Sequence, residues 1–327
     1  MKKIFGLLSF VVVVGIGCTK TSLTEQQELE ATPAVTGNLS HRGCASEEVL
    51  QQQLKDDPTL ASRMEAIEEL TARYEQNPTS YRLVNGKIEI PVVVNVLYKT
   101  AAQNISQAQI QSQIDVLNAD FSGNNTDINK VPATFTGVKA GDVGVYFVLA
   151  GVVRKATNKT SWSTNDAMKK GTQGGISPTT PSTTLNMWCC NMGGGSLGYA
   201  QFPGGSLATD GVVIDDNAFG KTGVTGPYTN GRTATHEVGH WLNLRHIWGD
   251  AQCGNDFVSD TPLHTGANYG CPATGATSSC AGTPIMMTMN YMDYTDDLCM
   301  YMFSAGQKGR MNATFAAGGG RNSFAQP

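Results

Sequence analysis

The chain has 327 residues, with 23 basic and 27 acidic side chains and a formal net charge of −4 at pH 7. This balance, without a basic cluster after the first residues, excludes a typical nucleic-acid-binding protein. Only 15% of the residues are charged and 37 are glycine, so we expect a loop-rich globular chain of one enzyme-sized domain with a small extension.

The first residues have the composition of a secretory signal peptide. Met1-Lys2-Lys3 is basic, and the apolar run at 4–16 is too short to span a bilayer. We expect residues 1–17 to be removed. Gly15-Ile16-Gly17-Cys18 resembles a bacterial lipobox with Cys18 as the lipidated residue, although Gly15 stands where Leu is usual, and free secretion is the alternative. Either way, we expect an extracytoplasmic protein, secreted or on the outer surface of a bacterium, with no later transmembrane helix.

The next region predicts an extension followed by the main domain. Residues 19–39 are polar and non-periodic, as in a flexible tether. Residues 58–77 have helical periodicity, with apolar residues at Leu60, Met64, Ile67, Leu70 and Tyr74. We assign 18–62 to a tether and pro-segment and 63–327 to the main domain.

Strands and helices then alternate. Residues 88–98 and 143–153 read as β-strands, as does 211–215. Ser106 is expected to cap a helix that buries Ile110, Ile114, Leu117 and Phe121. The Gly/Ser/Thr-rich stretch 171–195 stays unassigned. A helix is expected at 233–242, and a capping box at Ser304-x-x-Gln307 predicts a closing helix with Met311 and Phe315 on one face.

The stretch His236-Glu237-Val238-Gly239-His240 is typical of a zinc site. Histidines four apart lie on one face of a helix, where both imidazoles can bind one Zn²⁺. Glu237 can reach the metal's water without binding the metal. His246 requires the chain to turn after Leu242, and Asn243 tolerates the left-handed backbone that ends a helix.

Three ligands and one open position describe a catalytic zinc site rather than a structural one. The alternative, a buried helix with satisfied histidines, does not account for three of the five histidines and a glutamate in one register.

The extended motif, with Asn290-Tyr291-Met292-Asp293-Tyr294 as a Met-turn, resembles the pappalysin family of metzincin metalloproteases, and in particular its small bacterial members. Most metzincins have Gly where Asn243 stands. The resemblance implies an α+β fold: a mixed twisted sheet with backing and active-site helices above, and a loop-rich lower part with the Met-turn and C-terminal helix. Residues 197–203 would be the edge strand that binds the substrate backbone.

The resemblance also implies a zinc endopeptidase and assigns roles to its residues. Glu237 would be the general base, Met292 the floor beneath the zinc and Tyr294 a hydrogen-bond donor to the tetrahedral intermediate; a core aromatic is the alternative for Tyr294. Asp297 would floor the pocket for the residue after the cleaved bond, predicting cleavage before Arg, with Lys weaker. Asp296 or Asp293 could supply that charge instead, or Asp297 could be a plain surface acid.

Arg42-Gly43-Cys44 resembles the cysteine switch of related pro-segments, in which the Cys44 thiolate occupies the open zinc position in the latent form. A stray thiol or a disulfide partner is the alternative. An enzyme that cuts before Arg can remove its own pro-segment, so Ser62-Arg63 is the expected activation bond.

The remaining cysteines and acids support further expectations. Among eight cysteines, the resemblance implies the disulfides Cys253–Cys280 and Cys271–Cys299, and leaves Cys189 and Cys190 open. It also implies a structural Ca²⁺ held by Asp256 and the carbonyls near Ser259 and Thr261, against an Asx-turn as the alternative. We expect His264 at the surface, protein and peptide substrates, a monomer, and membrane contact only through Cys18. A non-catalytic binding protein on a protease scaffold and another metzincin subfamily are the competing interpretations.

Overall fold

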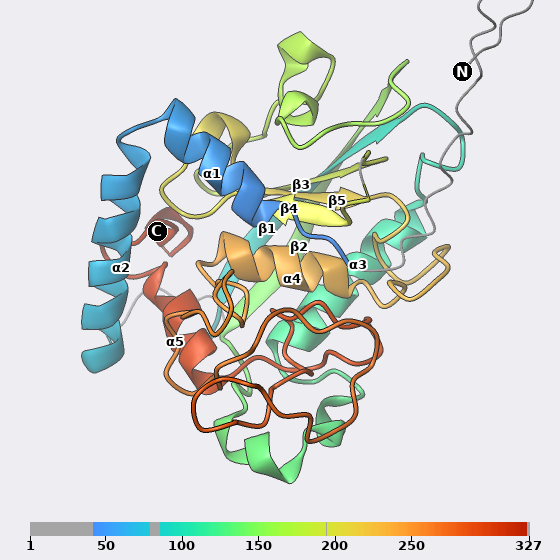
Figure 1. Ribbon diagram of the computed structural model, residues 1–327. Coiled ribbons are helices and arrows are strands. Elements are labelled where there is room, and N and C mark those ends of the chain that lie inside the picture. The colour runs from blue at the N-terminus through green and yellow to red at the C-terminus, as the bar shows by residue number, and fades with distance from the viewer. Residues whose placement is uncertain (1–41, 79–85, 194, 326–327) are drawn as a thin grey trace, which may run out of the picture. The chain divides into compact units, whose positions relative to one another are not determined.

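A five-stranded sheet carries the site, as the computed structural model shows for residues 42–78, 86–193 and 195–325 (Figure 1). The spatial order is β2-β1-β3-β5-β4, and every neighbouring pair is parallel except β4 and β5. The strands are β1 (Ile88–Tyr98), β2 (Val145–Ala156), β3 (Leu185–Cys190), β4 (Gly198–Ala200) and β5 (Val212–Asp215). β4 therefore forms an edge that can accept another chain.

Two helices pack in contact with the sheet and with each other: α3 (Gln107–Phe121) and α4 (Arg232–Trp241). Ser106 caps α3 by accepting a hydrogen bond from the backbone N–H of Gln109 at 3.0 Å. The predicted apolar face of α3 is buried and joins the main hydrophobic core with β1 and α4. In Figure 1, α4 runs beneath β4. This contact places the side chains of α4 next to the edge of the sheet.

Three further helices lie around this centre: α1 (Ser46–Asp56), α2 (Leu60–Gln76) and α5 (Ala305–Ala313). α2 packs against α5, and α1 contacts β4. The capping box at Ser304 and Gln307 is formed as predicted. Short 3-10 helices occupy Ile128–Lys130, Ala133–Val138, Ala167–Lys169, Gly171–Gln173, Leu207–Thr209 and Asn322–Phe324.

The segment between α4 and α5 has no regular helix or strand and forms the loop-rich lower part of Figure 1. Both disulfides that the resemblance implied, Cys253–Cys280 and Cys271–Cys299, are present there. Cys189 and Cys190 are free and buried in β3. The mixed α+β architecture predicted from the sequence is therefore correct.

Three local expectations need correction. Strand β3 lies in the stretch left unassigned, and α1 lies in the tether and pro-segment, for which no helix before residue 58 was expected. His264 is not a surface residue: its ring is fully buried, and its Nε2 accepts a hydrogen bond from the Met287 backbone at 2.9 Å. The signal peptide, Cys18, the tether and His41 lie outside the described residues. No described helix is long and apolar enough to span a membrane.

Candidate metal centre and active site

Helix α4 supplies two imidazoles from one face and then ends sharply. All its residues are buried. Asn243 has φ +72°, the left-handed backbone expected from the sequence, and the Leu244 N–H returns to the Gly239 carbonyl at 2.9 Å. This helix end sends the chain back toward the same face, so that His246 joins His236 and His240.

The three imidazoles meet through their Nε2 atoms. His240 Nε2 lies 3.1 Å from both His236 Nε2 and His246 Nε2. The Cys44 thiol completes the cluster, and the four ligand atoms all lie within 4.8 Å of one another. Three nitrogen donors and a sulfur, all buried, are the donor types and number that tetrahedral Zn²⁺ prefers, so these residues fit the metal.

Each imidazole is fixed by a second contact at its other nitrogen. His236 Nδ1 faces the Tyr291 carbonyl at 2.7 Å, and His240 Nδ1 faces the Leu244 carbonyl at 2.7 Å. A carbonyl can only accept, so both Nδ1 atoms carry the proton and both Nε2 atoms are free to bind metal. Burial lowers the pKa of His236 and His240, which keeps both rings neutral. His246 Nδ1 lies 2.5 Å from the Asp250 carboxylate.

Glu237, between the two histidines on α4, contacts the same cluster through Cys44. Its Oε2 accepts hydrogen bonds from Ser46 Oγ at 3.0 Å and from Cys44 Sγ at 3.3 Å. Burial raises the pKa of Glu237 to about 7. Gly198 of β4 passes so close that a Cβ there would lie 3.0 Å from Glu237 Oε1 and 2.7 Å from the Val213 carbonyl, so this strand position requires glycine.

The Met-turn packs under the metal cluster. A Cβ added at Gly239 would lie 2.5 Å from the Met292 sulfur, so Met292 contacts α4 between the two histidine ligands. Tyr294 lies above, with its ring centroid 4.9 Å from that of His246. The Tyr294 hydroxyl donates to the Cys44 carbonyl at 3.1 Å and accepts from the Cys44 N–H at 3.3 Å.

Asp297 floors a pocket that Arg42 fills. The Arg42 guanidinium forms an ion pair with Asp297 Oδ1 and donates to Thr233 Oγ1 at 3.2 Å and the Thr295 carbonyl at 3.1 Å. Its guanidinium carbon also lies 5.0 Å from the Tyr228 ring centroid. The carboxylate of Asp297 is therefore in a guanidinium-binding pocket rather than at the surface.

The 256–261 loop has the geometry of the Asx-turn alternative. Asp256 accepts hydrogen bonds from the Val258 N–H at 3.1 Å and from Thr261 Oγ1 at 2.8 and 3.0 Å. Ser259 is exposed. Because protein donors occupy both carboxylate oxygens, this arrangement does not fit Ca²⁺ ligation by Asp256 unless Thr261 turns away.

The expected activation bond lies at the surface. Ser62 and Arg63 are exposed in the first turn of α2. The Arg63 guanidinium pairs with Asp57 at 2.6 Å and donates to the Gly204 carbonyl at 2.7 Å. The bond is accessible, but this turn must unwind before a protease can bind it as an extended chain.

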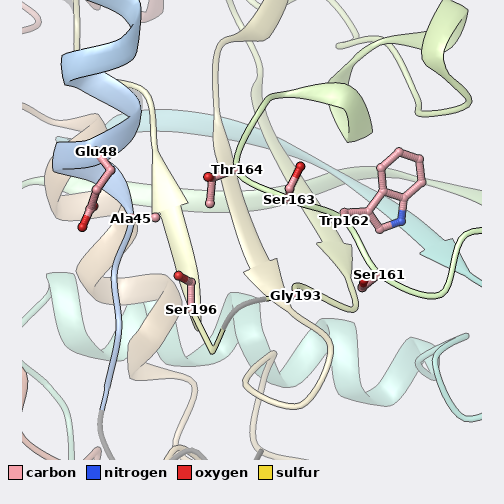
Figure 2. Close-up of a pocket in the computed structure, with 8 residues that line it drawn as sticks. All are labelled: Ala45, Glu48, Ser161, Trp162, Ser163, Thr164, Gly193 and Ser196. Atoms are coloured by element: carbon pink, nitrogen blue, oxygen red, sulfur yellow. The ribbon is translucent and has the colours of Figure 1, made fainter. Parts of the chain in front are cut away.

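A cavity of about 430 Å³ lies between the start of α1 and the neighbouring loops (Figure 2). Figure 2 shows Glu48 on α1 on one side and the loop with Trp162 on the other. It is lined by Ala45, Glu48, Ser161, Trp162, Ser163, Thr164, Gly193 and Ser196. None of the metal-cluster residues lines it, so it is separate from the zinc-binding cluster.

Two residues of the site, Ser46 and Asp250, were not assigned a role from the sequence, and the contact of Arg42 with Asp297 was not foreseen. Asp250 follows His246 by four positions, and a carboxylate close to a predicted ligand was a usable signal. Arg42 and Ser46 contact partners more than 190 positions away, so no local pattern reveals them.

Comparisons with known proteins agree with this site. The profile of the M43 peptidase family, described as pregnancy-associated plasma protein-A, matches residues 195–316. An extracellular metalloprotease of Colletotrichum graminicola is 32% identical over 311 residues, which are 88% of this chain and 95% of the relative. Extracellular metalloprotease 1 of Coccidioides posadasii is 31% identical and covers 76% of this chain and 84% of its own.

Two solved structures from Tannerella forsythia are also similar. A promirolysin mutant is 40% identical, with a TM-score of 0.78 and coverage of 87% of this chain and 97% of that chain. Mature mirolysin in complex with a cleaved peptide is 43% identical, with a TM-score of 0.71 and coverage of 76% and 97%. Identity of this extent over most of the chain, together with the His236–His240–His246 cluster, shows that the chain belongs to the pappalysin (M43) family of zinc metalloendopeptidases.

Proposed function

We propose that the protein is a secreted zinc endopeptidase, made as a latent precursor with a cysteine switch, that cleaves peptide bonds preferentially before Arg. One observation carries the proposal. The segment Arg42-Gly43-Cys44 fills the metal cluster with its thiol and the Asp297 pocket with its guanidinium at the same time.

Latency follows from what this segment blocks. Cys44 lies where a fourth zinc ligand would be, and Cys44 and Ser46 together occupy Glu237 Oε2. The backbone of the segment joins β4 like an added strand: the Leu197 N–H donates to the Gly43 carbonyl at 2.8 Å and the Ala45 N–H to the Gly198 carbonyl at 3.0 Å. One stretch of chain therefore takes the place of the catalytic water and of the substrate backbone, and it also binds the general base Glu237.

Once the segment leaves, the protein groups have distinct tasks. Zn²⁺, when bound, supplies a Lewis acid for a water molecule and for the peptide carbonyl. Glu237 takes a proton from the attacking water at Oε2 and transfers it to the leaving amine. The Tyr294 hydroxyl, which donates to a peptide carbonyl in the latent form, would donate to the substrate oxygen.

The preference for Arg is supported by the contacts of Arg42. Asp297 provides the charge, while Thr233 Oγ1 and the Thr295 carbonyl accept from other guanidinium nitrogens. A lysine ammonium cannot reach three separated acceptors in one plane, so we expect Lys to be cleaved less efficiently. Replacing Asp297 by Ala should remove the basic preference from a cleavage-site profile.

Activation would follow the same specificity. Cleavage between Ser62 and Arg63 puts Arg after the bond, and it separates α1 from the part of α2 that packs on α5. The sharpest test expresses residues 18–327 as wild type and as Cys44→Ala. We expect self-cleavage before Arg63 and earlier activity in Cys44→Ala, read by N-terminal sequencing and fluorogenic peptide hydrolysis. A Cys44→Ala protein that remains as latent as wild type would refute the switch.

Secretion, lipidation and oligomeric state belong to the same proposal. The relatives described as extracellular and the two disulfides support an extracytoplasmic location. Because those relatives are fungal, the bacterial lipobox at Cys18 needs its own test. Mass spectrometry of the mature N-terminus should find an acylated Cys18 if the protein is membrane-anchored, and light scattering should give a monomer.

Structural calcium is proposed on the resemblance, with the carbonyls of Ser259 and Thr261 as ligands and Asp256 as a third once the Thr261 hydroxyl turns away from its carboxylate. Burial raises the pKa of Asp256 to about 6, and none of the described Lys or Arg side chains forms an ion pair with it. Added Ca²⁺ should raise the melting temperature of wild type but not of Asp256→Asn. Equal melting temperatures with Ca²⁺ and with a chelator specific for it would leave the Asx-turn as the sole role of Asp256.

A further inference from the structure

We propose that Arg245 binds an acidic side chain of the substrate, two or three residues before the cleaved bond, after the pro-segment has left. This rests on the proposed function, since it requires a peptide with Arg in the Asp297 pocket and the loss of residues up to Ser62. It assigns a second charged subsite on the far side of the metal from Asp297.

Arg245 lies beside the metal cluster. It directly precedes the ligand His246, and its guanidinium carbon is 4.5 Å from the Phe202 ring centroid. The Phe202 ring in turn lies 5.3 Å from the His240 ring, centroid to centroid. The guanidinium is therefore held at the wall of the cleft by an aromatic ring that also contacts a ligand.

The carboxylate nearest to Arg245 comes from the pro-segment. Glu47 Oε2 of α1 lies 3.8 Å from Arg245 Nη1, and the two side chains are 30% and 17% exposed. Glu47 precedes Ser62, so it leaves with the pro-segment when that bond is cut. Arg245 then loses the one ion pair that it forms within the described part of the chain.

No neighbouring acid can replace Glu47. Two other carboxylates face Arg245, but Glu68 is bound to Arg310 at 2.5 Å and Asp250 to His246 at 2.5 Å. Arg245 Nε has no hydrogen-bond partner among the described residues. After the pro-segment has left, the Arg245 guanidinium can therefore pair with a carboxylate of the substrate.

The order of the pro-segment contacts gives the position of this subsite. Arg42 binds Asp297, Cys44 lies at the metal cluster, and Glu47 reaches Arg245 beyond it. Since the residue after the cleaved bond occupies the Asp297 pocket, Arg245 faces residues before that bond. An extended chain advances about 3.3 Å per residue, so a side chain two or three residues before the bond reaches the place of Glu47.

The test uses the full chain after it has processed itself, with the new N-terminus verified by sequencing. Matched fluorogenic peptides carry Arg after the cleaved bond and Glu, Gln or Lys at the second or third residue before it. We expect kcat/KM for the Glu peptide to exceed that for the Gln peptide by about fivefold at low salt, the size of a partly exposed ion pair. The ratio should shrink at high salt.

Variants of Arg245 separate a binding role from a structural one. Arg245→Gln should bring the Glu-to-Gln ratio to one, and Arg245→Glu should favour the Lys peptide. Arg73→Gln, which removes an exposed arginine on α2, is the matched control and should keep the wild-type ratio. An equal loss for both peptides in Arg245→Gln would mean a structural role and overturn the proposal.

The failure of this inference differs from the failure of the proposed function. Wild-type enzyme that cleaves the Glu and Gln peptides equally well, always before Arg, overturns the Arg245 subsite alone. If none of the peptides is hydrolysed before Arg, the proposed specificity is wrong, and the subsite is overturned with it.

Discussion

The chain before the end of α4 and the chain after it are stabilised in different ways. The first contributes five strands, and three of its helices pack on or beside the sheet. Its apolar side chains form most of the main core, which residues of the second region, such as Met292 and Phe315, also enter. The second has no regular element until α5 and carries both disulfides. His236 and His240 come from the first region, whereas His246 and the Met-turn come from the second. The metal cluster therefore joins the region built from the sheet and its helices to the region cross-linked by disulfides.

Because of this difference, we expect some substitutions to change catalysis without changing the stability of the fold. Glu237 lies on the regular helix, so its removal should change the reaction and leave the fold intact. We expect Glu237→Gln to lower kcat by about 10²–10⁴-fold, the usual contribution of a general base. Zinc content, measured by atomic absorption, should stay at wild-type level. A variant that turns over at the wild-type rate would assign the base elsewhere.

Removing a disulfide should loosen only the second region. The double replacement Cys271→Ser with Cys299→Ser should lower the free energy of unfolding by about 2–4 kcal/mol. Limited proteolysis should then cut between residues 253 and 299 first. For comparison, Ile110→Ala in the core of α3 should cost about 2–5 kcal/mol and expose the whole chain at once. Identical cleavage patterns in the two variants would contradict the division into two regions.

A smaller effect is expected where the two regions share a ligand. The Asp250 carboxylate holds His246 Nδ1 at 2.5 Å. Asp250→Asn should weaken zinc binding about 10–100-fold, as outer contacts of ligand imidazoles usually do. Competition with a chromophoric chelator measures this directly. Asp115→Asn, an exposed change on α3, should leave the zinc affinity unchanged.

The stability of the second region should depend on pH through two neighbouring groups, His264 and Asp293. Their effects have opposite signs. Burial lowers the pKa of His264 to about 4, so its stabilising effect is present above its unfolded value of about 6.5 and is lost as the pH falls toward 4. Burial raises the pKa of Asp293 to about 7, so its effect is present below about 3.9 and is lost as the pH rises toward 7.

Chemical denaturation from pH 4 to 7 separates the two. In His264→Gln the loss of stability on acidification should be smaller than in wild type, and in Asp293→Asn the loss on raising the pH should be smaller. Unchanged pH slopes in both variants would mean that neither group titrates as its burial implies.

The smallest expected effect is the loss of stability on removing the N-cap of α5. Ser304 accepts from the Gln307 N–H at 3.1 Å and donates to Asp260 at 2.6 Å. Ser304→Ala should lower stability by about 1 kcal/mol, the usual value of an N-cap, with little change in activity. Thermal melting measures it, and Ser163→Ala is a suitable exposed control.

The success of prediction from the sequence also differs between the regions before and after the end of α4. The strand at Ile88–Tyr98 was readable from its length and β-branched residues, and the α3 face from its helical periodicity and the Ser106 cap. β3 was not, because all six of its residues are buried and it therefore lacks the alternation that marks a half-exposed strand. In the second region, nothing local indicated that His264 would be buried, since its neighbours are loop residues and the Met287 backbone that binds it lies 23 positions away.

The site was predictable where its residues share one helix or turn. Spacing alone indicated that His236 and His240 would meet, and Asn243 indicated the turn that brings His246 to them. The ion pair between Arg42 and Asp297 spans 255 positions and could only be found in three dimensions.

The added strand at Gly198 has a kinetic consequence. In the latent form that we propose, residues 42–62 compete with every substrate as a tethered inhibitor, whose effective concentration is independent of dilution. A cut before Arg63 breaks none of their contacts with the cleft; it makes the same peptide a free ligand. The fraction of enzyme that has lost it then depends on how dilute the enzyme is and how much substrate competes for the site, so the activity per enzyme molecule after the cut should rise as the solution is diluted.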